Sequence, residues 1–210
     1  MKIVGVESSR DRGRFVVLFE DGEKIRAGTS QIADFGLYSG REMSEDEYAE
    51  LRENIELNSS KARALRMLGG RNYSAGEVEK RLVGKGDSAE TAQKTVEWLE
   101  SIGAVNDPEY AAMIVRHYYS KGYGLARIKD ELFRRGIARE MWDDALAAID
   151  GMEDMALGYL EKKLRGSSDK ADLRRAADAL CRRGFSYSDA SDAIKRYLEK
   201  LDSDYSDDSD

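Results

Sequence analysis

The sequence is poor in the residues that build disulfides, zinc sites and irregular loops. Its 210 residues include one cysteine, Cys181, one histidine, His117, and one proline. A single cysteine excludes an internal disulfide and fits a reducing cytoplasm. One cysteine and one histidine together exclude the usual zinc sites. A single proline favours helices over long irregular loops, and no metal or other cofactor is expected.

Long hydrophobic segments are missing as well. No apolar run exceeds six residues, and no secretory segment follows Met1. A membrane-spanning helix needs roughly 20 apolar residues. Hydrophobic residues still make up 41% of the chain and charged residues 36%, which is typical of a folded protein with a large solvated surface. We therefore expect a cytoplasmic protein of one to two domains without a membrane partner.

The net charge of −7 is unevenly distributed along the chain. Residues 1–57 hold 8 Lys and Arg against 13 Asp and Glu, and residues 202–210 hold five acidic residues and no basic one. Residues 58–201 hold 26 basic residues against 23 acidic ones. The middle of the chain is therefore mildly basic, and the overall acidity does not exclude a polyanionic partner.

The first part of the chain predicts a small antiparallel β-meander followed by helices. Strands are expected at 2–7, 14–20 and 23–27, because Asp21-Gly22 between apolar runs is a strong hairpin signal. A short helix is expected at 30–38. Ser44 and Glu47 form a capping-box pattern, which predicts a helix from Ser44 to about Leu57.

An internal repeat dominates the rest of the chain. A leucine stands four residues before a glycine in three segments, offset by 50 and then 48 residues: Leu82 to Gly86, Leu132 to Gly136 and Leu180 to Gly184. Apolar positions on both sides of these segments align at the same offsets. The glycines fall where a helix C-terminus needs a residue that tolerates positive φ. The pattern predicts three related helical units.

Each unit is predicted to contain three helices. In the first unit they cover about 60–68, 74–83 and 88–102, and Asp107 is predicted as the N-cap that opens the second unit, with Pro108 at the first helical position. The fold class is mainly α, an elongated and curved tandem array of three three-helix repeats after a small N-terminal β-meander with helices. The predicted boundaries are 1–57 for the N-terminal module, 58–106, 107–151 and 152–201 for the repeats, and 202–210 for a disordered acidic tail.

The sequence offers no catalytic constellation. His117 lies in a predicted helix among tyrosines, and Cys181 has no histidine partner for nucleophilic chemistry. The glycine-bearing loops match no phosphate-binding motif. Tyr73, Tyr110, Tyr118 and Trp98 have helical spacing and are interpreted as core residues rather than as base-stacking residues. We therefore predict a protein that is not an enzyme.

Basic residues recur at one place in the repeats. Arg134-Arg135 and Arg182-Arg183 directly precede the repeat glycine, and Lys85 is the single basic counterpart in the first unit. Cations near a helix C-terminus also favour the helix dipole, so one such pair alone carries little information. Recurrence at a fixed repeat position favours a basic stripe, which Arg127 extends. Such a stripe suits a long polyanion or an acidic protein surface.

The same segments resemble the regulatory protein RecX family, whose members modulate the RecA recombinase. The similar motifs are Arg71–Ser74 with Glu77-Val78 and Arg81-Leu82, Gly103–Asp107 before Tyr110-Ala111, Gly122–Gly124 through Gly136-Ile137, and Phe35–Met43. The resemblance covers nearly the whole chain except the acidic tail. Two positions depart from the expectation: Ala104 replaces a bulkier residue, and Gly76 weakens a helix by about 1 kcal/mol.

The resemblance implies a non-enzymatic regulator that binds the RecA filament on single-stranded DNA across several protomers. Such a regulator inhibits recombinase, ATPase and coprotease activities, and thereby modulates DNA repair and the SOS response. We expect a monomer, and direct contact with single-stranded DNA is left open. The expected contact residues are Arg127, Arg134, Arg135, Arg182, Arg183 and Lys85. The alternatives are a direct DNA-binding regulator of helix-turn-helix type and a scaffold that binds other proteins.

Overall fold

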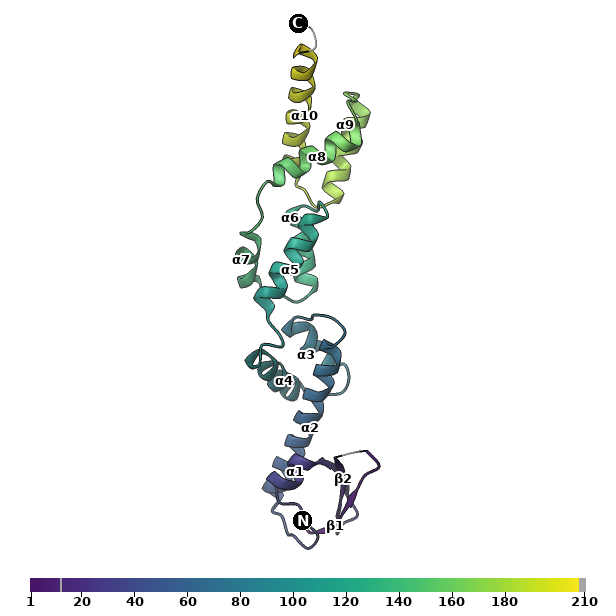
Figure 1. Cartoon of the computed structure of the whole chain (residues 1–210), viewed down its shortest axis with the longest axis vertical. Coiled ribbons are helices and arrows are strands. Elements are labelled where there is room, and N and C mark those ends of the chain that lie inside the picture. Colours follow the sequence, from purple (N-terminus) through teal and green to yellow (C-terminus); the bar gives the residue numbers. More distant parts are fainter. Residues whose placement is uncertain (12, 208–210) are drawn as a thin grey trace. The chain divides into compact units, whose positions relative to one another are not determined.

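The computed structural model describes residues 1–11 and 13–207 (Figure 1). It is mainly helical with a small three-stranded antiparallel sheet at the N-terminus, as the sequence predicted. Packing divides the chain into two compact units. The first unit contains residues 1–72 and 78–105, and the second contains residues 73–77 and the chain from residue 106 onward. Within the described part of the chain, no helix is both long and apolar enough to cross a lipid bilayer.

The N-terminal meander has the predicted topology. Strands β1 (Ile3–Ser8), β2 (Arg14–Phe19) and β3 (Lys24–Gly28) pair in sequence order, and Gly22 takes a φ of +88° in the turn between β2 and β3. Helix α1 (Thr29–Asp34) is shorter than the predicted 30–38, because Gly36 takes a φ of +54° and turns the chain away. Buried side chains from the strands, including Val17, pack with Leu51 of the following helix.

Helix α2 (Glu45–Leu68) is continuous, whereas the sequence predicted two helices that separate near residues 57–60. Its capping box is present: the Ser44 hydroxyl accepts from the Glu47 amide over 3.1 Å, and the Glu47 carboxylate accepts from the Ser44 amide over 2.8 Å. Ser60 does not interrupt the helix, because its buried hydroxyl donates to Asp87 over 2.9 Å and accepts from Thr95 over 3.0 Å. The predicted boundary between residues 57 and 58 therefore lies inside a helix.

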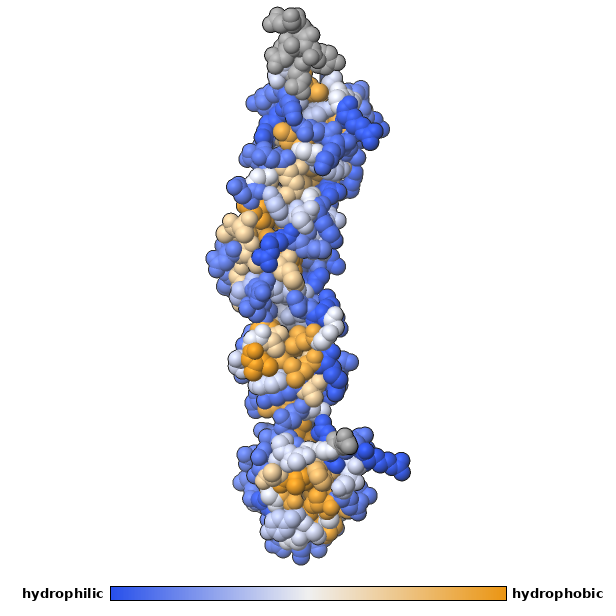
Figure 2. Space-filling model, viewed as in Figure 1, coloured by the Kyte–Doolittle hydropathy of each residue, from blue (hydrophilic) through white to orange (hydrophobic). Residues whose placement is uncertain are grey.

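Helices α3 (Ala75–Val83) and α4 (Ala89–Ser101) complete the first predicted repeat. Helix α2 contacts α4, and the fully buried side chains in this region include Val78, Leu82 and Leu99. Figure 2 shows hydrophobic residues gathered on the visible surface over the sheet and over the helices that follow it. The first unit therefore buries a modest core and leaves part of its apolar surface exposed.

The second unit contains the two remaining three-helix sets. The first set is α5 (Asp107–Ser120), α6 (Leu125–Arg134), and a single 3₁₀ turn (Arg139–Met141) that leads into α7 (Trp142–Leu146). The second set is α8 (Met152–Leu164), α9 (Lys170–Arg182) and α10 (Tyr187–Asp207). Each set has its own apolar cluster, around Leu132 in the first and Leu180 in the second.

Two boundaries in this unit differ from the prediction. Asn106, and not Asp107, is the N-cap of α5, because its side chain accepts from the Glu109 amide over 3.1 Å. Helix α10 continues to Asp207, beyond the predicted start of the tail at Asp202. Adding residues to an existing helix is much easier than starting one, so an acidic sequence can prolong it. Residues 208–210 of the predicted tail lie outside the described residues.

Candidate partner-binding surface

The repeated Leu-to-Gly segments are helix C-termini of one design. Each repeat glycine has a positive φ: +99° at Gly86, +68° at Gly136 and +94° at Gly184. The residue after each glycine donates its backbone N–H to the carbonyl of the repeat leucine over 3.1 to 3.2 Å. The three pairs are Asp87 with Leu82, Ile137 with Leu132 and Phe185 with Leu180. This geometry satisfies carbonyls at the helix end, and it confirms the predicted role of the glycines.

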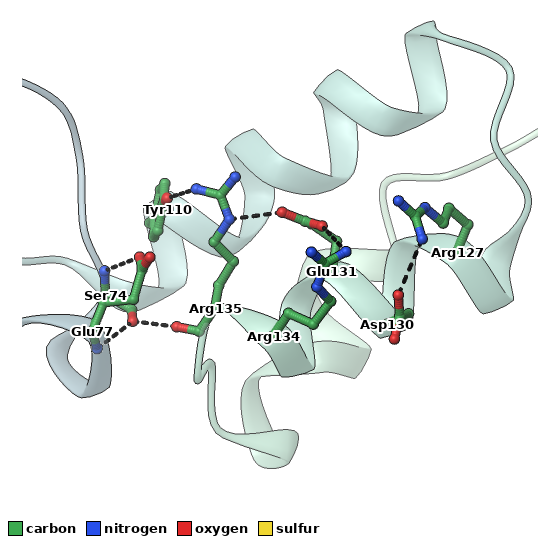
Figure 3. A network of polar contacts seen from close by, with 8 residues as sticks. All are labelled: Ser74, Glu77, Tyr110, Arg127, Asp130, Glu131, Arg134 and Arg135. Atoms are coloured by element: carbon green, nitrogen blue, oxygen red, sulfur yellow. Dashed lines mark hydrogen bonds and ion pairs between the residues drawn. The ribbon is translucent and has the colours of Figure 1, made fainter. Parts of the chain in front are cut away.

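Arg135 is engaged within its own repeat. Its guanidinium donates from Nε to the Glu131 carboxylate over 2.8 Å and from Nη1 to the Tyr110 hydroxyl, as Figure 3 shows. Tyr110 is only 6% exposed, in agreement with its interpretation as a core residue. Burial alone would raise the pKa of Glu131, but the hydrogen bond and charge of Arg135 outweigh burial and lower that pKa. Arg135 therefore stabilises a largely buried carboxylate.

Arg134 and Arg127 lie on the same helix with more exposed side chains. Arg134 reaches the other oxygen of Glu131 at 3.6 Å, and 58% of its side chain is exposed. Arg127 lies 3.3 Å from Asp130, one turn along α6, and 39% of its side chain is exposed (Figure 3). Ion pairs at this exposure contribute little to stability, so both guanidinium groups remain accessible to a partner.

Arg183 is engaged with the preceding repeat. Its guanidinium donates to two backbone carbonyls, those of Gly122 over 3.0 Å and Lys121 over 2.7 Å. The same group lies 5.2 Å from the ring centre of Tyr123 and 5.1 Å from that of Tyr159, within the range of cation–π attraction. Arg183 thus joins the end of α9 to the loop after α5 and to α8.

Arg182 and Lys85 are exposed as well. Within residues 1–11 and 13–207, neither side chain forms an ion pair. Arg182 lies in the second unit beside Arg183, whereas Lys85 lies in the first unit. The structure therefore brings five of the six predicted contact residues into one unit and leaves Lys85 in the other.

Backbone contacts bring Arg127 close to the Arg182-Arg183 pair. The amide of Gly124 donates to the Arg183 carbonyl over 3.0 Å, and the amide of Ala126 donates to the Gly184 carbonyl over 3.0 Å. A Cβ atom at Gly184 would lie 2.5 Å from the backbone nitrogen of Arg127. The end of α9 therefore packs directly on the start of α6, and only glycine fits there.

A related contact joins the start of α3 to the end of α6. The Ser74 hydroxyl donates to the Arg135 carbonyl (Figure 3), and the amide of Ala75 donates to the Asp107 carboxylate over 2.9 Å. A Cβ atom at Gly76 would lie 3.2 Å from the carbonyl oxygen of Gly136, which explains a glycine within a helix. Burial raises the pKa of Asp107, partly offset by the hydrogen bond from Ala75.

Sequence reasoning missed the groups that hold the arginines. Glu131 and Tyr110 had no assigned role with Arg135, and Lys121 was not recognised beside Arg183. The spacing of Glu131 four residues before Arg135 was an available signal, since such pairs meet on one helix face. No local pattern pointed to the carbonyls of Lys121 and Gly122, because that contact joins residues about sixty positions apart.

Two family models match the repeats. The model described as the first three-helix domain of RecX matches residues 61–99, and the model described as the second three-helix domain of RecX matches residues 106–146. Both matched ranges carry a Leu-to-Gly segment with its basic residues.

Curated proteins are similar over a larger part of the chain. Regulatory protein RecX from Xanthomonas campestris pv. campestris (strain B100) is 36% identical over 126 residues, which are 59% of this chain and 78% of that protein. Regulatory protein RecX from Trichlorobacter lovleyi is 35% identical over 145 residues, which are 65% of this chain and 92% of that protein.

Solved structures agree in fold. A crystal structure of regulatory protein RecX superposes with a TM-score of 0.72 at 22% identity, over 93% of this chain and 98% of that one. A crystal structure of RecX from Lactobacillus salivarius superposes with a TM-score of 0.62 at 21% identity, over 69% of this chain and 97% of that one. At these identities the likeness concerns the fold.

Proposed function

Because the chain belongs to the RecX family of regulatory proteins, we propose that it regulates the RecA recombinase by binding the filament that RecA forms on single-stranded DNA. Binding across several protomers inhibits strand exchange, ATP hydrolysis and coprotease activity, and so modulates DNA repair and the SOS response. In this proposal the protein acts by binding RecA and not by catalysis. Family membership over most of the length of its relatives is the observation that carries this proposal.

The repeat architecture supports a filament as the partner. A filament presents the same surface at regular intervals, and a protein with repeated units presents its own contact residues at intervals as well. Each additional contact is then intramolecular, so affinity for the assembled filament rises above affinity for a single protomer. A monomeric protein in the cytoplasm is part of this proposal.

We assign the direct contacts to the exposed cations first. Arg134 and Arg182 occupy equivalent repeat positions, and Arg127 and Lys85 extend the set. Arg135 and Arg183 remain part of the proposed surface as partly exposed positive charges, but their main donors already bind other groups of this chain. An acidic protein surface or exposed phosphates in the filament groove would complement these charges.

The competing function is sequence-specific DNA binding by helix-turn-helix units. The third helices of the three sets carry acidic residues in their first turns, namely Glu90 in α4, Asp143 and Asp144 in α7, and Asp189 in α10. A recognition helix places its N-terminal residues against base edges and phosphates, where carboxylates are repelled. Helix α7 is also only five residues long. These features favour binding to the RecA filament over sequence-specific recognition of bases in a DNA groove.

The proposal is tested by RecA ATP hydrolysis on single-stranded DNA, with this protein added at less than one copy per RecA subunit. We expect inhibition at this ratio, because one regulator that blocks a filament affects many protomers. Unchanged hydrolysis at equal or higher ratios would contradict the proposal. Sequence-specific binding to duplex DNA with no effect on RecA would favour the competing function.

A further inference from the structure

A basic groove lies in the second unit, between the loop that follows α5 and one face of α8. Its cavity volume is about 960 Å³. This volume is at the upper end for small-molecule sites and has room for an extended chain. Cations, tyrosines and glycines make up most of its lining, which also holds Ser120, Asp154 and Met155. The cations, tyrosines and glycines include Lys121, Lys162, Lys163, Tyr119, Tyr159 and Gly158.

The lysines of the groove are not neutralised by a carboxylate of the described residues. Lys121, Lys162 and Lys163 form no ion pair with any residue that the structure describes. Asp154 is the acidic residue of the lining, and its carboxylate accepts from Arg196 at 2.8 Å, an arginine that Glu153 shares. The lining holds four cations against this one carboxylate. The groove therefore carries a positive potential that a polyanion would relieve.

Arg183 fixes one wall of the groove. Its bonds to the carbonyls of Lys121 and Gly122 hold the loop after α5, and its guanidinium lies against Tyr159 of α8. Because these contacts use neutral carbonyls, the positive charge of Arg183 is retained in the wall. The loop and α8 are thus held in one arrangement before any ligand arrives, which lowers the entropic cost of binding.

Gly158 opens the other wall. It lies inside α8, where glycine destabilises a helix by about 1 kcal/mol relative to alanine. A Cβ atom at this position would meet nothing within 4 Å. Unlike Gly76 and Gly184, Gly158 is therefore not required by packing against this chain. A glycine in open space beside a groove allows close approach of another backbone.

The tyrosines of the groove favour single-stranded nucleic acid over an acidic peptide as its ligand. Tyr119 is held by a hydrogen bond from its hydroxyl to the Asp150 carbonyl, and Tyr159 is held by Arg183. Both rings line the groove and are partly exposed. A positively charged groove with aromatic rings is typical of proteins that bind single-stranded nucleic acid. An acidic peptide would use the cations alone.

We propose that this groove binds the sugar–phosphate backbone of single-stranded nucleic acid directly, with Lys121, Lys162 and Lys163 as the phosphate contacts. Lysine heads act as point charges on phosphates and read no sequence, so binding is expected to be independent of base sequence. This site contributes to bare nucleic-acid binding, and it does not depend on the proposed action on RecA.

The first experiment measures binding of a labelled oligo(dT) of about 16 nucleotides by fluorescence anisotropy without RecA. Lys162→Gln/Lys163→Gln is expected to weaken binding about tenfold at low salt and to reduce the salt slope by about 1.4, since each single-strand phosphate contact contributes about 0.7. Lys170→Gln/Lys195→Gln removes the same charge from exposed positions outside the groove and is expected to change the affinity less than twofold.

A second variant tests the shape of the groove without changing charge. Gly158→Leu places a side chain where the structure has open space, so the helix is expected to fold at least as stably as the parent. Binding of the oligonucleotide is nevertheless expected to weaken at least about fivefold, because the groove is filled. Circular dichroism and thermal unfolding confirm that the variant is folded.

Three outcomes would overturn the proposal. The first is equal binding by the parent and by both groove variants, and the second is equal loss in the Lys170→Gln/Lys195→Gln control. The third is displacement of the oligonucleotide by poly-glutamate at equal charge concentration, which would assign the groove to acidic peptides. Inhibition of RecA ATP hydrolysis by the same variants is measured separately, so failure here leaves the proposed function independently testable.

Discussion

The arginine pairs Arg134-Arg135 and Arg182-Arg183 occupy the same place in successive repeats but differ in what they bind. The second arginine of each pair is engaged by this chain. Arg135 binds Glu131 and Tyr110 of its own repeat, whereas Arg183 binds backbone carbonyls of the preceding repeat. The first arginine of each pair is largely exposed. A repeated position therefore predicts where a side chain lies, and its neighbours decide its role.

The difference between Arg135 and Arg183 has a simple sequence cause. Four residues before Arg135 stands Glu131, and four residues before Arg183 stands Ala179. A carboxylate one helical turn away attracts the guanidinium back onto its own helix. Without that carboxylate, Arg183 extends to carbonyls across the junction between repeats, and it thereby stabilises the junction.

The largest effect on stability is expected at the contact between the end of α9 and the start of α6, which is closer than the contact between the start of α3 and the end of α6. A Cβ atom at Gly124 would lie 2.5 Å from the backbone nitrogen of Phe185, and backbone atoms cannot move aside as a flexible side chain does. Gly124→Ala is therefore expected to lower the free energy of unfolding by about 3 kcal/mol. Urea unfolding followed by circular dichroism measures this change.

The matched substitution is Gly76→Ala, at the contact between the start of α3 and the end of α6. Its Cβ atom would lie 3.2 Å from the Gly136 carbonyl oxygen, which is a milder contact, and alanine improves the helix by about 1 kcal/mol. The expected net loss is below about 1 kcal/mol. Equal losses in the free energy of unfolding for Gly124→Ala and Gly76→Ala would contradict this difference between the two contacts.

The next effect concerns the carboxylate that holds Arg135. Glu131→Gln leaves Arg135 without its charged partner in a largely buried site, so the free energy of unfolding is expected to fall by about 2 kcal/mol. Glu161→Gln is the control, since Glu161 pairs with Lys200 in a more exposed position and is expected to cost less than about 0.5 kcal/mol. A loss of the same size in the control would refute the structural role of Glu131.

Replacing Arg183 is expected to lower the free energy of unfolding by less than replacing Glu131. Arg183→Lys keeps the charge but loses the planar group that reaches two carbonyls at once, and a loss of about 1.5 kcal/mol is expected. Arg182→Lys, at the exposed neighbour, is expected to change stability by less than about 0.5 kcal/mol. Thermal unfolding of the two variants at equal salt measures the difference. If Arg182→Lys proves the more damaging change, the assignment of roles within the pair is reversed.

The smallest effects are expected in the pH dependence. The pKa of Glu131 lies below its ordinary value of 4.5, because Arg135 overcomes the effect of burial, so ionised Glu131 stabilises the fold above that pH. This stabilisation is lost as the pH falls through the lowered pKa. The pKa of Asp107 is raised above 3.8 by burial, so its contribution has the opposite sign and is lost as the pH rises through the raised pKa.

Asp107→Asn separates these two contributions. The amide oxygen can still accept from the Ala75 amide, and no charge remains to be buried. Stability near neutral pH is therefore expected to be unchanged or slightly higher, while the loss of stability below pH 4.5 that comes from Glu131 persists. If that loss of stability disappears in Asp107→Asn, its assignment to Glu131 is wrong.

Much of the fold was predictable from local signals. The hairpin at Asp21-Gly22, the capping box at Ser44 and the repeat glycines each specify a backbone conformation through their own chemistry. The continuity of α2 was not predictable, because the Ser60 hydroxyl binds Asp87 and Thr95, which lie far along the chain. A serine hydroxyl can compete for the backbone hydrogen bonds of a helix, and here these distant partners occupy it instead.

The candidate surface was predictable only in its location. The recurrence of basic residues before the repeat glycine identified the helix ends, and those ends have the expected geometry. The division into engaged and exposed arginines required tertiary contacts, since the Arg183 partners belong to a neighbouring repeat. The repeat also drew attention away from Lys121 and Gly158, which stand outside the repeated segment and line the groove.

The central claim is that the exposed arginines contact RecA while their neighbours maintain the fold. Its most direct test compares inhibition of RecA ATP hydrolysis by the parent, Arg134→Gln/Arg182→Gln, and the control Arg116→Gln/Lys195→Gln, which removes the same charge from exposed positions on other helices. We expect the first variant to keep its stability within about 0.5 kcal/mol and to require at least about tenfold more protein for half-inhibition, whereas the control should match the parent. Unaltered inhibition by the folded Arg134→Gln/Arg182→Gln variant would contradict the claim.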